Sequence, residues 1–141
     1  MTRKSALLLP FYPPWFRPAA PRYEKLVSPY RSKCDVYQLL VPYGVVPERF
    51  AMAHPSLIHH AMPLSERKGR RAAAVRVRTW MDQSAPSYGK VVLLAFGDLM
   101  EVWGKGAVGA SLDNVRLIEP NRRSRGIDGV LVRRKLEAAL R

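Results

Sequence analysis

The chain has little of what several common protein classes depend on. Its 141 residues include a single cysteine, Cys34, which excludes a disulfide framework and a zinc site built from several thiolates. No apolar run approaches the roughly 20 residues that a helix needs to span a bilayer. The apolar stretch near the start, Ala6 to Leu9, is too short for a secretory signal and ends at Pro10. These absences predict a cytoplasmic protein that does not enter a membrane.

Acidic residues are also scarce, with 11 Asp and Glu against 24 Lys and Arg and a net charge of +13. The excess lies in three blocks, because residues 1–33 carry +6, residues 66–78 carry +5 and residues 122–141 carry +5. The intervening segments 34–65 and 79–121 carry −1 and −2. Charge sorted in this way is typical of a protein that binds a polyanion, with nucleic acid as the leading candidate. We expect the three blocks to form one continuous cationic face.

Length and composition predict a single domain over residues 1–141. Nearly half of the residues, 48%, are apolar, which is enough for a packed core. Arginine outnumbers lysine 17 to 7. Because the guanidinium group is planar and weakly hydrated, this bias favours phosphate contacts and stacking on bases.

Four apolar segments predict β-strands: Ala6–Leu9, Asp35–Val41, Lys90–Phe96 and Val115–Ile118. The third is apolar on both faces, as an inner strand of a parallel sheet would be. Pro42, Tyr43 and Gly44 predict a turn after the second strand.

Helical spacing of apolar residues predicts two longer helices, over residues 65–82 and 127–140. A shorter helical turn is expected after Pro47. Strands that alternate with helices predict an α/β fold. We expect a mostly parallel sheet of about four strands with helices on both faces, a Pro-rich N-terminal loop over residues 10–21 and a basic C-terminal helix within residues 122–141.

The Pro-rich loop is the first candidate binding segment. It holds five prolines together with Tyr12, Trp15, Phe16 and the neighbouring Arg17. Exposed aromatic rings beside an arginine can stack on unpaired bases. The alternative is that these rings anchor the loop on the core.

The basic blocks are the second candidate, and the helix over residues 65–82 is the sharpest of them. A solvated helix face normally mixes acids with its bases at i±4 spacing, whereas this cluster contains only Glu66. Phosphate contact is therefore favoured over a merely solvated face. The predicted phosphate-binding residues are Arg17, Arg22, Arg67, Lys68, Arg70, Arg71, Arg76, Arg78, Arg122, Arg123, Arg125, Arg133 and Arg134.

Catalytic and metal-binding patterns are missing from the sequence. His54, His59 and His60 with Cys34 match no zinc-ligand spacing. There is no Ser–His–Asp order, no pair of carboxylates in an apolar setting and no phosphate-cradling loop of the Walker type. We therefore predict no catalytic residue, no metal and no cofactor.

The order of several short motifs resembles the α/β domain of the archaeosine synthase and archaeal tRNA-guanine transglycosylase family. The motifs lie within residues 6–97 and are Leu7-Leu8-Leu9-Pro10, the strand Asp35–Val41, Gly44-Val45-Val46-Pro47, Pro55, and Tyr88 before Lys90-Val91-Val92. The resemblance implies an α/β fold with affinity for RNA.

The same resemblance implies that the chemistry of the family is lost in this chain. The synthases of the family carry a Pro-Cys-x-x-x-Lys-Pro-Tyr stretch, whose lysine attacks a nitrile on a modified tRNA base. Here Phe11 follows Pro10, and Arg17-Pro18 stands near the Lys-Pro position but out of register. Since arginine keeps its proton, it cannot act as that amine nucleophile.

These observations predict a non-catalytic RNA-binding protein, ribosomal or ribosome-associated, with rRNA as its partner and ribosomal proteins as possible neighbours. One alternative is a tRNA base-modification enzyme or subunit of the resembled family. Another is a DNA-binding protein of chromatin or of a virus.

Overall fold

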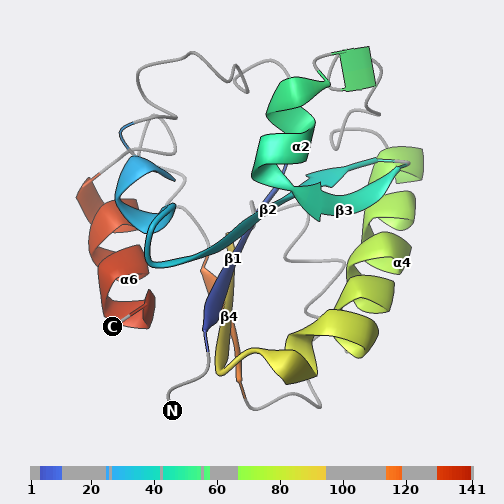
Figure 1. Ribbon diagram of the computed structural model, residues 1–141. Helices are drawn as coiled ribbons and strands as arrows, with labels where there is room; N and C mark the ends of the chain where they lie inside the picture. The colour runs from blue at the N-terminus through green and yellow to red at the C-terminus, as the bar shows by residue number, and fades with distance from the viewer. Residues whose placement is uncertain are drawn as a thin grey trace.

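A computed structural model gives the arrangement of the chain (Figure 1). The structure describes residues 4–10, 25, 27–41, 43–54, 56–57, 67–94, 114–118 and 130–140, without the side chains of Pro10, Arg70, Leu117 and residues 130–133. None of the helices within these ranges is both long and apolar enough to cross a membrane.

The described strands form one five-stranded sheet in the order β3-β2-β1-β4-β5. Their bounds are β1 Ser5–Pro10, β2 Cys34–Leu40, β3 Gly44–Pro47, β4 Lys90–Leu94 and β5 Val115–Ile118. Strand β1 lies parallel to β2 on one side and to β4 on the other, and β4 lies parallel to β5. Only β3 is antiparallel, to β2. The predicted α/β class and the mostly parallel sheet are confirmed.

The predicted number of about four strands was too low, because β3 had not been expected. After β2 the chain returns along the same strand as β3, so that Val46 pairs with Gln38. Gly44 has a φ of +118°, a conformation that glycine adopts without the steric cost of a Cβ. A run of two valines is too short to predict a strand by itself, and pairing with β2 supplies the partner that sustains it.

In the described ranges, three helices and two 3₁₀ turns accompany the sheet. Their bounds are α2 Glu48–Ala53, α4 Arg67–Ser84, α6 Val130–Leu140, η1 Ser28–Tyr30 and η2 Ala85–Ser87. The helical turn expected after Pro47 is α2, and the two longer predicted helices are α4 and α6. Helix α4 ends at Ser84, slightly past the predicted end at residue 82, and α6 ends at Leu140 as predicted, while the predicted starts at residues 65 and 127 lie outside the described residues.

The helices cover both faces of the sheet, as predicted. On one face, α4 places Ala73, Val77, Trp80 and Met81 against strand residues such as Leu8. On the other face, one cluster joins Leu136 of α6, Ala51 of α2 and Tyr30 of η1 to Leu7, Leu9 and Leu94. Neighbouring residues of β1 thus face opposite layers, because side chains alternate along a strand. Figure 1 shows α4 and α6 on opposite sides of the sheet.

The short length of β3 shapes one edge of the molecule. Its pairs with β2 run only from Tyr37 to Leu40, so the first residues of β2, Cys34–Val36, extend beyond the end of β3. Helix α2 begins directly after Pro47, at the same point. The start of β2 and the first turn of α2 therefore form what we call the β2–α2 edge.

Candidate nucleic-acid interface

Helix α4 separates an apolar face from a cationic one. Ala73, Val77 and Met81 are almost completely buried against the sheet. Arg67, Arg71 and Arg78 are exposed, and their spacings of four and seven residues place them on one stripe of the helix. Lys68 and Arg76 are exposed as well. We call these five cations, Arg67, Lys68, Arg71, Arg76 and Arg78, the α4 cationic face.

The described part of the chain supplies no acid that neutralises the α4 cationic face. Among the residues that the structure describes, no carboxylate forms an ion pair with any of the five cations. Asp82 is the only acidic residue of α4. The side chain of Val75, 64% exposed, lies on the solvent side of the same helix. This surface therefore presents several guanidinium groups whose hydrogen-bond donors face solvent.

Arg76 extends the α4 cationic face toward the sheet edge. A Cβ atom built on Gly44 would lie 3.8 Å from Cδ of Arg76, so the aliphatic stem of this arginine runs over the start of β3. Long cationic side chains often pack their stems on the protein while the charged group stays in water.

The basic residues described on α6 do not join this surface. Arg134 and Lys135 are exposed, but α6 packs through the fully buried Leu136 on the face of the sheet opposite to α4. The expectation of one continuous cationic face is thus wrong for the two described basic helices. The two helices lie on opposite faces because the chain crosses from one layer to the other between them. The net charge of each segment does not indicate this crossing.

Ten predicted site residues cannot be placed. Tyr12, Trp15, Phe16, Arg17, Arg22, Arg122, Arg123 and Arg125 lie outside the described residues, as do the side chains of Arg70 and Arg133. The proposed base-stacking loop therefore stays a prediction.

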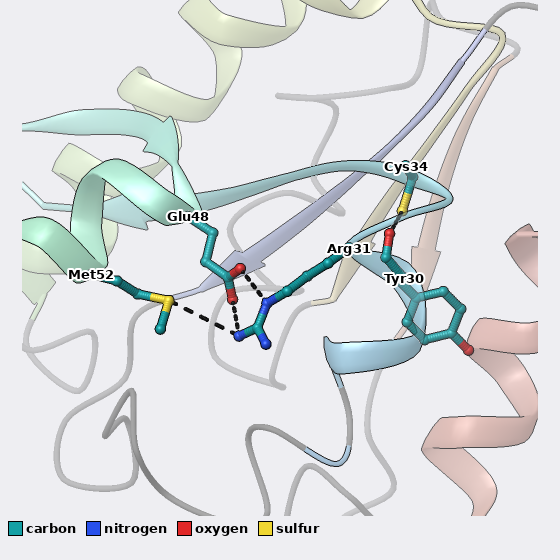
Figure 2. Close-up of polar contacts among 5 residues, drawn as sticks. All are labelled: Tyr30, Arg31, Cys34, Glu48 and Met52. Atoms are coloured by element: carbon teal, nitrogen blue, oxygen red, sulfur yellow. Dashed lines mark hydrogen bonds and ion pairs between the residues drawn. The ribbon is translucent and has the colours of Figure 1, made fainter.

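A half-buried ion pair that sequence reasoning missed connects Arg31, directly after η1, to α2 at the β2–α2 edge (Figure 2). Arg31 Nε donates to Glu48 Oε1 at 2.8 Å, and its Nη2 donates to Oε2 at 3.1 Å. The same Nη2 lies 4.0 Å from Met52 Sδ. The Glu48 side chain is only 6% exposed, so its charge depends on this two-point contact.

A second polar network lies at the beginning of the parallel strands. Lys4 Nζ lies 2.9 Å from Asp35 Oδ1, and the Tyr88 hydroxyl donates to Asp35 Oδ2 at 2.9 Å. The Tyr88 and Tyr37 hydroxyls are also hydrogen-bonded to each other. Burial by itself raises the pKa of Asp35, but the hydrogen bonds from Lys4 and Tyr88 outweigh it, and the pKa lies below its ordinary value.

Cys34 and His54 show no metal-binding or nucleophilic arrangement. Cys34 is buried and its Sγ donates to the Tyr30 carbonyl oxygen at 3.2 Å. Burial, followed by the nearby charge of Asp35, raises the pKa of the thiol to about 11, which keeps it protonated at neutral pH. His54 stacks on Phe50 with ring centroids 4.2 Å apart. Within the described part of the chain, no group of three or more His, Cys, Asp or Glu side chains could hold a metal ion.

A weak signal for the missed ion pair was present in the sequence. Glu48 is one of only two acids in residues 34–65, and it follows Pro47 at the predicted start of a helix. Its partner Arg31 had been counted only as part of an N-terminal basic block. Neither residue type nor spacing indicates that η1 and the start of α2 meet in space.

Comparison with protein-family models, with curated proteins and with solved structures found no match in any of the three. The resemblance to the archaeosine synthase family therefore stays a prediction based on the motifs alone.

Proposed function

We propose that this protein binds structured RNA without catalysing a reaction, and that the α4 cationic face contacts RNA phosphates. The single observation that carries the proposal is the exposure of five cations on one helix with no carboxylate partner among the described residues. Exposed arginines of this kind contribute little to folding, since they are not buried and form no ion pair with another described residue. Their grouping on one element is explained by an external anion.

The expected source of affinity is the release of counterions from RNA. Each phosphate that an arginine neutralises releases condensed cations into solution, which makes binding strong at low salt and weak at high salt. Guanidinium groups also bind phosphate oxygens through two parallel hydrogen bonds. The small size and the net charge of +13 favour rRNA in a ribosomal or ribosome-associated role. The alternative of tRNA modification has only the motif resemblance in its favour.

A matched pair of double variants tests the proposal. Arg71→Gln with Arg78→Gln removes two charges from the α4 cationic face. Lys33→Gln with Arg116→Gln removes two charges from exposed positions outside α4. We expect the α4 variant to bind a structured rRNA fragment at least about tenfold more weakly in fluorescence anisotropy, and the control to stay within about threefold.

Two outcomes would contradict the proposal. Equal weakening by both double variants would mean that only net charge matters, and unchanged affinity of the α4 variant would remove the helix from the interface. Melting temperatures close to that of the wild type are expected for both variants, because the four side chains are exposed. Co-sedimentation with ribosomal subunits at high salt tests the choice of rRNA, and binding only to duplex DNA would contradict it.

A further inference from the structure

A cavity of about 470 Å³ opens at the β2–α2 edge. It lies beside the start of β2, past the end of β3, and next to the first turn of α2. The lining residues are Lys4, Arg31, Cys34, Asp35, Val36, Tyr37, Pro47, Glu48 and Arg49. Cavities of this size hold small molecules in other proteins. None of the described lining residues belongs to α4, so this lining is distinct from the α4 cationic face.

The acidic groups of the cavity are already engaged. Both Glu48 carboxylate oxygens accept hydrogen bonds from the Arg31 guanidinium. The two Asp35 oxygens are bound by Lys4 and by the Tyr88 hydroxyl. A cation that entered the cavity would therefore meet no uncommitted carboxylate oxygen and would face three positive side chains.

The hydrogen-bond donors of the cavity are in excess. A lysine ammonium group has three donors, and Lys4, with its side chain 62% exposed, gives one of them to Asp35. A guanidinium group has five donors, and Arg49 forms no hydrogen bond or ion pair with another described residue. Arg49 lies close enough to contribute to the lowered pKa of Asp35. The occupant that complements this lining is an anion rich in acceptor oxygens.

The rest of the lining is apolar or aromatic. Pro47 contributes aliphatic surface, and Tyr37 contributes a ring that is held by contacts with Trp80 and Tyr88 at centroid distances of 5.0 and 6.2 Å. The side chain of Val36 faces the opposite layer. A phosphate ion alone would leave most of a cavity of about 470 Å³ unfilled. A sugar or base attached to the phosphate would fill that volume and contact this wall.

We propose that the cavity at the β2–α2 edge binds a phosphate ester of nucleotide size, with the phosphate between Lys4 and Arg49 and the remainder against Pro47 and Tyr37. The phosphate ester can come from a free mononucleotide or from the 5′-terminal nucleotide of an RNA strand. Both sources supply the same chemical group to the same residues.

Nuclear magnetic resonance titration of the whole protein tests this proposal with three probes. The probes are AMP, a 5′-phosphorylated trinucleotide and the same trinucleotide with a 5′-hydroxyl end. We expect saturable amide shifts at Val36, Tyr37 and Arg49 with at least one phosphorylated probe and none with the 5′-hydroxyl probe. Saturation by AMP indicates a free nucleotide, and saturation by the phosphorylated trinucleotide alone indicates an RNA end.

Arg49→Gln is the informative variant, since this side chain is exposed and its loss leaves both carboxylates paired. We expect it to weaken binding of the phosphorylated probe about tenfold, which is the value of one charge-assisted hydrogen bond. Arg116→Gln, on the strand at the far edge of the sheet, is the matched control and should leave binding within about twofold. No saturable shift with either phosphorylated probe, or equal weakening by both variants, would overturn the proposal.

Discussion

The α4 cationic face and the β2–α2 edge use positive charge in opposite ways. On α4, arginines point to solvent and none has a carboxylate partner among the described residues. At the β2–α2 edge, Arg31 and Lys4 are bound to Glu48 and Asp35. The first arrangement leaves all five charges available for another molecule, whereas the second commits Arg31, and part of the donor capacity of Lys4, to acids of the fold itself.

What separates the two regions is the presence of an enclosed acid. Glu48 is 5% exposed, and a buried carboxylate must be paired because its removal from water is costly. Among the residues that the structure describes, the apolar face of α4 encloses no acid. The charge of a sequence block therefore does not distinguish cations that stabilise the fold from cations that bind a partner, and the distinction depends on which acids the fold buries beside them.

The largest effect on stability is expected from Arg31→Met, which removes the two hydrogen bonds of the guanidinium group to the buried Glu48 carboxylate. We expect the free energy of unfolding to fall by about 3 kcal/mol in urea denaturation. The variant should still bind RNA with wild-type affinity at temperatures where it is folded, because Arg31 lies outside the α4 cationic face.

The double variant Arg31→Met with Glu48→Gln is the control for this prediction. This variant neutralises Glu48 in addition to removing the Arg31 guanidinium, and it should recover much of the lost stability. A single variant as stable as the wild type, or a double variant less stable than the single one, would contradict the structural role of this pair.

A smaller effect is expected from Tyr88→Phe, which removes one hydrogen bond to Asp35. Because the folded pKa of Asp35 is lowered, its contribution to stability is present above the unfolded pKa of about 4 and is lost as the pH falls through the folded pKa. Without the hydroxyl the folded pKa rises toward the unfolded value. The variant should lose about 1 kcal/mol at neutral pH and correspondingly less in acid.

Tyr43→Phe is the matched control, since Tyr43 is 50% exposed and its hydroxyl forms no hydrogen bond with another described residue. Urea denaturation at neutral and acidic pH measures both variants. If Tyr88→Phe and Tyr43→Phe have the same stability at every pH, the Tyr88–Asp35 hydrogen bond has no energetic role.

The smallest effect concerns Cys34, which lines the cavity of the β2–α2 edge. Because burial raises the pKa of its thiol to about 11, alkylation by iodoacetamide at neutral pH should be slow in the folded protein and fast in urea. Mass spectrometry over time measures both rates. Fast alkylation of the folded protein would mean that Cys34 is a reactive thiol, which would contradict its burial and its raised pKa.

Much of the fold could be predicted because its signals are local. Apolar residues at helical spacing, such as Val77 and Met81, predict the buried face of α4. An unbroken apolar run predicts β4. Strand β3 could not be predicted, since two valines form a strand only when β2 lies beside them.

The candidate sites could be predicted only in part, for the same reason. Exposure of Arg71 and Arg78 followed from their helical positions opposite the apolar face. The opposite placement of α4 and α6 could not, because it depends on how the chain crosses the sheet. The pairing of Arg31 with Glu48 likewise depends on a contact between residues that are distant in the chain.

The most direct test of the α4 cationic face is the salt dependence of RNA binding. The logarithm of the association constant for a structured RNA should fall linearly with the logarithm of the salt concentration. Arg71→Gln with Arg78→Gln should reduce the magnitude of that slope by about 1.5, since each lost phosphate contact removes roughly 0.7 to 0.9. A slope identical to that of the wild type would contradict the assignment of this helix to the RNA interface.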